Sequence, residues 1–258
     1  MSLEKKEDAF DQRLEEMGIR IKDANNFKVR DNVFDEVTFL ALHKLAHKKW
    51  FTAIGGSIST GKEANVFYGE REEAAIAIKI YRIQSANFTT MSSYITGDRR
   101  FSQVKKSRKD LIFAWTRKEF SNLVRAKDAG IPVPEPIVWD RNILIMSFLG
   151  EGECPFPQLR TADIREPAEV YDMILNYIGI LYKKAEIVHG DLSEFNILYG
   201  DKPYIIDMGQ SVTRDHPRAL QFLMRDIRNI NRFFKKRCDI KTEYDVFNTI
   251  TGLHAAEP

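Results

Sequence analysis

The chain has 258 residues, of which 43% are hydrophobic and 29% are charged, and this composition excludes a wholly disordered protein. Its 39 Lys and Arg residues against 37 Asp and Glu residues leave a net charge of +2, so binding to a polyanion would need local basic clusters. The length allows one large domain or two lobes, since a domain takes about 150 residues.

The sequence indicates neither a secreted nor a membrane protein. Two cysteines, Cys154 and Cys238, are too few for a disulfide framework and are typical of a reducing compartment. Residues 1–14 lack the apolar core of a secretory signal, and no apolar run approaches the roughly 18 residues of a membrane helix. We therefore expect a cytoplasmic protein that does not contact a membrane.

The first third of the chain predicts helices followed by strands. Residues 1–50 are amphipathic, and their helical pattern ends at Gly55-Gly56. The apolar side chains of that pattern are Phe34, Val37, Leu40, Leu42 and Leu45. Ala64, Val66 and Tyr68 then alternate with polar neighbours, and residues 75–80 form an apolar run after a polar turn. These two segments predict a β-hairpin.

A polar stretch, residues 84–110, separates this hairpin from the next predicted helix. Its weak periodicity predicts a flexible insertion. Residues 111–129 regain helical periodicity, and Gly130 follows as a C-cap. Two apolar segments around a turn at residues 140–142 predict a second hairpin.

After a Pro-rich link at residues 150–157, helical patterns dominate to about residue 250. Two short apolar strands, at residues 197–199 and 204–206, interrupt them, and the helix-like run 219–234 follows. A strand-rich first part and a helix-rich second part predict two lobes.

The segment His189–Leu198 has the polar residues that phosphoryl transfer needs. Asp191 and Asn196 stand five positions apart before an apolar strand, and Asp207 follows the next strand. A hairpin would gather the three side chains at one edge. One carboxylate can accept the proton of a hydroxyl, while an amide oxygen and a second carboxylate hold Mg²⁺. The alternative is that these residues serve only as turn and cap residues.

Lys79 stands in the apolar run 75–80, where a buried ammonium group needs a negative partner. We interpret it as a ligand of the α- and β-phosphates, held by Glu119 on the 111–129 helix; Glu169 and Glu186 belong to the second part and fit less well. The alternative is an edge-strand lysine that faces solvent.

A Ser/Thr-rich turn precedes the first hairpin and contains further candidates for phosphate contact, through backbone N–H groups and hydroxyls. The candidates are Ser57, Ser59, Thr60, Gly61, Lys62 and Val66. The turn imitates a Walker A loop, but Glu63 occupies the required Ser/Thr position and a strand pattern follows instead of a helix. We therefore reject a P-loop NTPase.

These segments resemble the RIO family of atypical protein kinases, and most closely its type-one branch. Residues 59–67 resemble the family's replacement for a Gly-rich loop, residues 189–198 its catalytic loop and residues 206–210 its metal-binding loop. Tyr-Ile-Thr-Gly-Asp-Arg-Arg-Phe, residues 94–101, favours the type-one branch.

The resemblance implies an α+β, two-lobed kinase-like fold. It implies an N-terminal helical extension (1–50) packed on the kinase domain, an N-lobe (51–149) with an antiparallel sheet and the flexible insertion, and a mainly helical C-lobe (150–258). Between residues 210 and 219 there is no room for an activation segment or for peptide-docking helices.

The resemblance also implies ATP and Mg²⁺, or Mn²⁺, as cofactors, and roles for individual residues. Asp191 would be the catalytic base, with Lys79 and Asp207 as further catalytic residues. Asn196 and Asp207 would hold the metal. Met146 corresponds to the gatekeeper, so the backbone of Ser147 and Leu149 would hydrogen-bond adenine.

Three hypotheses follow: a serine/threonine kinase, an ATPase that acts as an assembly switch through a phosphorylated Asp207, and an inactive nucleotide-binding scaffold. The intact polar positions disfavour the scaffold. The resemblance implies a pre-ribosomal small-subunit partner, either rRNA or ribosomal protein. Two basic segments, residues 99–109 and 225–237, are candidates for RNA contact, although most such runs are solvated faces. Ser107 is a candidate autophosphorylation site, with an ordinary loop serine as the alternative.

Overall fold

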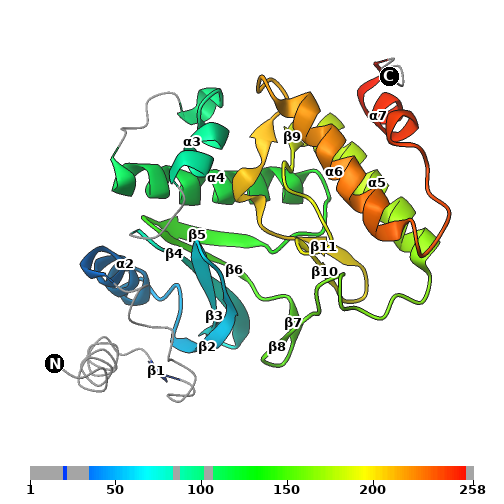
Figure 1. Ribbon diagram of the computed structural model, residues 1–258. Coiled ribbons are helices and arrows are strands. Elements are labelled where there is room, and N and C mark those ends of the chain that lie inside the picture. The colour runs from blue at the N-terminus through cyan, green and yellow to red at the C-terminus, as the bar shows by residue number, and fades with distance from the viewer. Residues whose placement is uncertain (1–19, 22–34, 84–87, 102–106, 254–258) are drawn as a thin grey trace. The chain divides into compact units, whose positions relative to one another are not determined.

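The computed structural model describes residues 20–21, 35–83, 88–101 and 107–253 (Figure 1). The described residues fall into two compact units, each considered by itself below. Unit 1 lies within Met1–Phe88, Val104–Arg117 and Pro136–Pro155, and unit 2 lies within Thr89–Gln103, Lys118–Glu135 and Phe156–Pro258. No helix among these described ranges combines the length and apolar character needed to cross a bilayer.

Unit 1 contains a six-stranded sheet with the strand order β1-β2-β3-β4-β6-β5 (Figure 1). All neighbouring strands are antiparallel except β1 and β2, which are parallel. The strands are β1 Arg20–Ile21, β2 Ala53–Thr60, β3 Ala64–Arg71, β4 Ala74–Tyr81, β5 Pro136–Asp140 and β6 Ile143–Ser147. The short strands β7 (Gly150–Glu151) and β8 (Cys154–Pro155) form a separate hairpin. Both predicted hairpins, β3–β4 and β5–β6, are confirmed.

Helix α2 (Glu36–His47) packs its apolar face on the core of this sheet. Asp35 caps its N-terminus, since its Oδ1 accepts from the backbone N–H of Thr38 at 2.9 Å. Leu42 and Leu45 are buried, whereas Leu40 is 52% exposed. The predicted N-terminal helix is therefore confirmed for residues 36–47, and Phe34 lies outside the described residues.

The helical prediction for residues 1–50 is wrong at Arg20–Ile21, which pair with Ala53 and Ile54 as strand β1. Gly55-Gly56 also lie inside strand β2 rather than at the end of a helix. A Cβ atom on Gly55 would approach Cδ1 of Tyr68 to 3.1 Å, so this position favours glycine because the neighbouring strand is close. A glycine pair by itself cannot distinguish this packing from a helix stop.

Helix α4 (Arg108–Asp128) begins at Ser107 and ends before Gly130. The Ser107 hydroxyl accepts from the backbone N–H of Asp110 at 3.2 Å and donates to Oδ2 of Asp110 at 2.6 Å, which identifies Ser107 as the N-cap. Gly130 has φ +86°, and its N–H donates to the carbonyl of Lys127 at 2.9 Å. The predicted helix and its glycine C-cap are confirmed.

We expect Ser107→Ala to lower the free energy of unfolding by about 1 kcal/mol, because it removes the N-cap acceptor of α4. Urea denaturation followed by circular dichroism measures this loss. Ser107→Asp keeps an acceptor at the same position and is the matched control. Equal stability of the wild type and the alanine variant would contradict the capping role.

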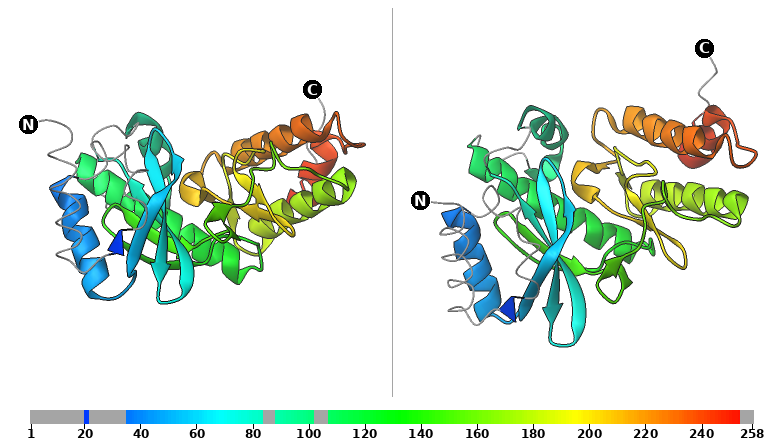
Figure 2. Two further views of the ribbon diagram at one scale, coloured as in Figure 1. Left: turned by 90° about the horizontal axis from the view of Figure 1, so that it is seen from below. Right: turned by 60° about the horizontal axis from the view of Figure 1, so that its bottom comes forward.

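Unit 2 consists mainly of helices. Its helices are α3 Phe88–Ile95 (described with this unit), η3 Arg99–Phe101, α5 Pro167–Lys183, η4 Met208–Gln210, α6 Ala219–Phe234 and α7 Glu243–Thr251, together with the second half of α4. Its short strands are β9 Ile187–Val188, β10 Ile197–Tyr199, β11 Pro203–Ile205 and β12 Val212–Thr213. Strand β10 pairs with β11, and β9 pairs with β12, both antiparallel. The views in Figure 2 show α5, α6 and α7 side by side.

Residues 88–101 lie inside the predicted flexible insertion 84–110, and they form α3 and η3. The weak periodicity of this segment did not indicate these two helices. Tyr94 is buried and stacks on Phe222 of α6 at a ring distance of 5.1 Å, and Arg218 donates to the carbonyl of Ser93 at 3.1 Å. Partners more than 120 residues away stabilise α3, so local periodicity could not reveal it.

Candidate active site

The catalytic-loop candidate Asp191 is half-buried in unit 2 and lies between two amide donors. Nδ2 of Asn196 donates to the backbone oxygen of Asp191 at 2.8 Å and to its Oδ2 at 3.3 Å. Nε2 of Gln210 donates to the same Oδ2 at 3.1 Å. Burial raises the pKa of Asp191 above its ordinary value of 3.8. The carboxylate is thus oriented by hydrogen bonds and is a better proton acceptor than an exposed aspartate.

The backbone on both sides of Asp191 is held by Asp226 of α6, which is 1% exposed. Its Oδ2 accepts from the N–H of Gly190 at 2.7 Å, and its Oδ1 accepts from the N–H of Leu192 at 2.9 Å. The Arg225 guanidinium donates to the carbonyl of Gly190 and to the Tyr94 hydroxyl. The sequence does not reveal the role of this Arg-Asp pair, because its only local signal is a pair of charges in an otherwise amphipathic helix.

Position 190 requires a glycine. Its φ is +80°, a region that L side chains rarely adopt, and an added Cβ would lie 3.1 Å from the carbonyl oxygen of Gln210. The glycine therefore lets the candidate catalytic loop run close to the segment after Asp207.

Asp207 follows β11 and begins the 3-10 turn η4. The N–H of Ile206 donates to the carbonyl of Asn196 at 3.0 Å, so the residue before Asp207 is bonded to the residue that begins the hairpin. The predicted β10–β11 hairpin therefore places Asn196 and Asp207 at one end of the ribbon. Asp207 is exposed and has φ +61°. Its negative charge adds to the rise that burial causes in the pKa of Asp191.

The donor set at this end suits Mg²⁺ or Mn²⁺ bound to a polyphosphate. Among the described residues no group of three or more His, Cys, Asp or Glu side chains could hold a metal without help. Asn196 and Asp207 would supply one amide oxygen and one carboxylate. In such sites phosphate oxygens and water commonly fill the remaining coordination positions of Mg²⁺. Because both hydrogen bonds of the Asn196 side chain use Nδ2, its acceptor Oδ1 can face a metal.

His189 precedes this loop and is buried. Its Nδ1 accepts from the N–H of Asp191 at 3.3 Å, so its Nε2 carries the proton and donates to the carbonyl of Ile206 at 3.0 Å. Burial lowers the pKa of His189 below 6.5, in agreement with a neutral ring. The imidazole thus links the catalytic loop to the strand that leads to Asp207.

We expect the stability advantage of the wild type over His189→Leu to shrink as the pH falls below 6.5. In the unfolded chain this histidine is protonated near pH 6.5, whereas in the folded protein it stays neutral to a lower pH. The contribution of the neutral His189 to the free energy of unfolding is therefore complete above pH 6.5 and is lost as the pH falls below it. Urea unfolding of both proteins between pH 5 and 8 measures this difference, since titrating groups far from His189 contribute equally in the two proteins. A difference that stays constant with pH would contradict a neutral buried His189.

In unit 1, Lys79 lies in β4 between Val66 of β3 and Leu144 of β6. It is therefore in an interior strand and 6% exposed, which excludes the alternative of an edge-strand lysine facing solvent. Its Nζ lies 5.2 Å from the Tyr81 ring centroid. Glu119, 1% exposed, belongs to unit 2, and its pairing with Lys79 stays a prediction.

The Ser/Thr-rich segment is not all turn: Ser57, Ser59 and Thr60 lie at the end of strand β2, and only residues 61–63 connect β2 to β3. The Ser57 hydroxyl lies 3.2 Å from the Thr60 hydroxyl, and the N–H of Gly61 donates to the carbonyl of Ala64 at 2.9 Å. A Walker A loop opens a helix, so the strand that begins at Ala64 confirms that this is no P-loop. Ser59 in β2 and Lys62 in the connection are exposed.

The predicted adenine contacts lie on and after β6. Met146 is buried and pairs with Ala77 of β4, and Ser147 ends the strand opposite Ile76. Leu149 follows as a half-buried residue. The segment thus lies beside the strand that carries Lys79, while its contact with adenine stays a prediction.

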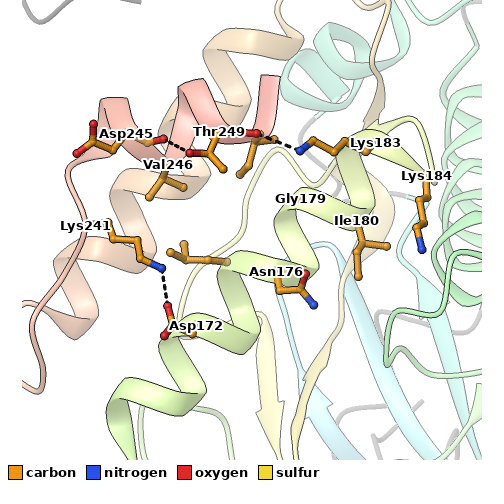
Figure 3. Close-up of a pocket in the computed structure, with 12 residues that line it drawn as sticks. Asp172, Asn176, Gly179, Ile180, Lys183, Lys184, Lys241, Asp245, Val246 and Thr249 are labelled. Atoms are coloured by element: carbon orange, nitrogen blue, oxygen red, sulfur yellow. Dashed lines mark hydrogen bonds and ion pairs between the residues drawn. The ribbon is translucent and has the colours of Figure 1, made fainter. Parts of the chain in front are cut away.

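A separate cavity of about 530 Å³ lies in unit 2 between α5 and α7 (Figure 3). Lys183 donates to the carbonyl of Thr249 at 3.0 Å, and Lys241 pairs with Asp172 at 2.7 Å at its edge. None of the predicted site residues lines this cavity, and the bond from Lys183 to Thr249 joins α5 to α7.

Comparisons with known proteins identify the family of the chain. A family model described as RIO domain matches residues 65–247. The chain is 41% identical over 244 residues to the RIO-type serine/threonine-protein kinase Rio1 of Haloferax volcanii. The aligned region covers 94% of this chain and 84% of that protein. It is 38% identical over 239 residues to the serine/threonine-protein kinase RIO1 of Homo sapiens. That match covers 90% of this chain and 42% of the human protein, so the chain spans less than half of the human relative.

Solved structures show the same fold. The Rio2 kinase of Chaetomium thermophilum matches with a TM-score of 0.64 and 28% identity, over 83% of this chain and 68% of that chain. A second structure of that kinase, described as its ADP/Mg²⁺-phosphoaspartate complex, has the same TM-score and covers 66% of that chain. The expected α+β kinase-like fold is confirmed. The chain belongs to the RIO family of atypical serine/threonine protein kinases, in its type-one branch.

Proposed function

We propose that this chain transfers the γ-phosphoryl group of ATP, with Mg²⁺ or Mn²⁺, to the hydroxyl of serine or threonine. The observation that carries the proposal is the oriented Asp191 carboxylate beside the hairpin end that bears Asn196 and Asp207. Asp191 accepts the hydroxyl proton as the oxygen bonds to the γ-phosphorus and the bond to ADP breaks. The metal, held by Asn196 and Asp207, supplies charge neutralisation on the phosphates.

The remaining candidates bind the nucleotide. Lys79 contacts the α- and β-phosphates and is held by Glu119, while the turn from Ser57 to Lys62 and Val66 cover the phosphates. Met146 lines the adenine pocket, and the backbone of Ser147 and Leu149 hydrogen-bonds the base. The buried position of Lys79 on an interior strand supports its role, since such a lysine needs anionic partners.

A second function, ATP hydrolysis through a phosphorylated Asp207, is supported by two observations. Only residues 211–218 separate η4 from α6, which leaves no segment to dock a peptide. The matching Rio2 kinase is described as an ADP/Mg²⁺-phosphoaspartate complex. In this reaction a carboxylate oxygen of Asp207 bonds to the γ-phosphorus of ATP and ADP leaves. Water then hydrolyses the acyl phosphate, which restores the carboxylate and releases inorganic phosphate.

Incubation with γ-labelled ATP and Mg²⁺ separates the two functions. A kinase leaves label on protein as acid-stable phosphoserine or phosphothreonine, which hydroxylamine does not remove. The switch leaves a hydroxylamine-labile acyl phosphate on Asp207 and releases inorganic phosphate. If the wild-type protein neither labels protein nor releases phosphate in the presence of Mg²⁺, both proposals are wrong.

We also propose a cytoplasmic role in small ribosomal subunit maturation, with contact to rRNA or a ribosomal protein. The exposed residues Lys235 and Lys236 after α6 are the best candidates for phosphate contact. Other basic residues of the two segments already serve the fold: Arg225 holds the catalytic loop, and Arg228 pairs with Glu243 at 3.0 Å.

We expect the double substitution Lys235→Gln and Lys236→Gln to weaken binding to small-subunit rRNA. The slope of log K against the logarithm of the salt concentration should also become less steep, by the release of up to about two fewer counterions. Filter binding between 50 and 200 mM KCl measures both quantities. Lys183→Gln and Lys184→Gln, in the other exposed lysine pair of unit 2, form the control. Equal salt slopes for all three proteins would contradict the proposed contact.

A further inference from the structure

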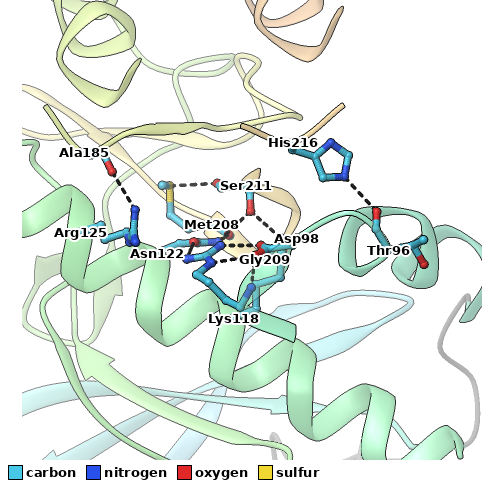
Figure 4. Close-up of polar contacts among 11 residues, drawn as sticks. Thr96, Asp98, Lys118, Asn122, Arg125, Ala185, Met208, Gly209, Ser211 and His216 are labelled. Atoms are coloured by element: carbon cyan, nitrogen blue, oxygen red, sulfur yellow. Dashed lines mark hydrogen bonds and ion pairs between the residues drawn. The ribbon is translucent and has the colours of Figure 1, made fainter. Parts of the chain in front are cut away.

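The segment after Asp207 is held by two buried side chains of α4 (Figure 4). Nζ of Lys118 donates to the carbonyl of Gly209 at 2.9 Å and to the carbonyl of Ser211. Nδ2 of Asn122 donates to the carbonyl of Met208 at 2.8 Å and to that of Ser211 at 2.9 Å. Lys118 and Asn122 stand one helical turn apart and are both 0% exposed, so they form one donor surface toward residues 208–211.

The amide of Asn122 is itself oriented. Nη1 of Arg100 donates to its Oδ1 at 2.9 Å, so its Nδ2 has to face the carbonyls. Arg100 in turn is fixed by Asp98, 1% exposed, whose two carboxylate oxygens accept from Nε at 2.9 Å and from Nη2 at 2.7 Å. The donor surface therefore has a second layer of charged support from η3.

The supported segment has no regular sheet or helix ladder of its own beyond one 3-10 turn. Asp207 adopts φ +61°, and a non-glycine residue keeps this conformation only where its surroundings over-determine it. The carbonyl of the next residue, Met208, is one of the acceptors of Asn122. The α4 donors thus restrain the backbone on the C-terminal side of the candidate metal ligand.

This support does not depend on one protonation state. Burial lowers the pKa of Lys118 to about 7. A neutral amine still has two N–H donors for its two carbonyl acceptors, and an ammonium group has three.

We propose that Lys118 and Asn122 are positioning residues that set Asp207 for metal binding before the nucleotide arrives. The inference rests on the proposed function of Asp207 as a metal ligand. Outer residues that orient a ligand typically change metal affinity by 10- to 100-fold when they are replaced. Removal of either donor should therefore weaken the metal site without removing a group that touches the metal.

The test uses Lys118→Met and Asn122→Leu, which keep side-chain volume and remove the donors. Asn142→Leu is the matched control, because Asn142 of unit 1 is also a 0% exposed asparagine that donates two hydrogen bonds. Its acceptors are the Thr38 hydroxyl at 2.8 Å and the Tyr81 carbonyl at 2.9 Å. Each protein is studied at a temperature where circular dichroism shows it folded.

Two readouts are independent of turnover. Hydrogen exchange of the peptide covering residues 207–213 in nucleotide-free protein should be faster in both variants than in the control. Mn²⁺ affinity in the presence of ADP, measured by electron paramagnetic resonance, should fall about tenfold. In turnover, the Mg²⁺ concentration for half-maximal rate should rise more than the KM for ATP.

Unchanged exchange and unchanged Mn²⁺ affinity in a folded variant would overturn the inference. If Lys118→Met does not fold, Asn122→Leu decides alone. The wild-type protein is tested first for Mn²⁺ binding with ADP and for ATP turnover. If it shows neither, the proposed function is refuted, and the variants do not bear on the inference.

Discussion

Asp191→Ala should lower phosphoryl transfer by about 100- to 10,000-fold while ATP binding survives, because it removes the proton acceptor and no predicted nucleotide contact. Burial raises the pKa of this carboxyl group above 3.8. The base has to be ionised, so the wild-type kcat/KM should fall as the pH drops through that raised pKa, and the variant should lack this acidic limb. Single-turnover labelling measures the rate, and fluorescence titration with an ATP analogue measures binding.

The matched control for this experiment is Asp201→Asn, at the exposed turn of the same hairpin, where the carboxylate accepts from the Tyr204 hydroxyl at 2.7 Å. It should leave the rate within about twofold of the wild type, since surface substitutions rarely have larger effects. Near-normal turnover of Asp191→Ala would refute the assignment of the base. Loss of ATP binding together with turnover would instead indicate that Asp191 supports the fold of the loop.

Asp226→Ala should strongly destabilise unit 2. It leaves the buried N–H groups of Gly190 and Leu192 without acceptors, at a cost of about 1–3 kcal/mol each. A total of about 2–6 kcal/mol is a large fraction of a typical stability of about 5–15 kcal/mol. Activity should fall even in the folded fraction, because both N–H groups flank Asp191. Urea unfolding at pH 6 and activity per folded molecule measure the two effects.

The pH dependence provides a second check on Asp226. Burial raises its pKa to about 7, so the folded protein retains a proton that the unfolded chain loses near pH 3.8. The advantage of the wild type over Asp226→Ala should therefore shrink as the pH rises from about 4 to 7, opposite in direction to the His189 effect. Asp172→Ala, at an exposed ion pair with Lys241, is the control and should cost less than about 1 kcal/mol at every pH.

Much of the fold could be predicted from local patterns. The alternation at residues 64–68, the apolar run 75–80 and the turn residues between them predict β3 and β4, which pair as an antiparallel hairpin. The run 219–234 coincides with α6. The spacing of Asp191, Asn196 and Asp207 around two short strands predicts their gathering at one hairpin end, and the bond from Ile206 to Asn196 agrees with it.

The prediction failed where a segment depends on distant partners. Strand β1 exists because Arg20 and Ile21 pair with β2, and α3 exists because Tyr94 and its neighbours contact α6. Neither segment has a local pattern that reveals its partner. The pairing of Lys79 with Glu119 and the contacts of residues 146–149 with adenine remain predictions.

The amino-acid order alone determined which residue types meet at the hairpin, because turn chemistry and period-two alternation act within a few residues of each other. Only the tertiary structure decided how these residues are held. Asp226 is bonded to backbone 34 and 36 positions away, and Lys118 to carbonyls 91 and 93 positions away. Buried charged and polar side chains cost free energy unless such partners satisfy them, and no local pattern identifies partners at that separation.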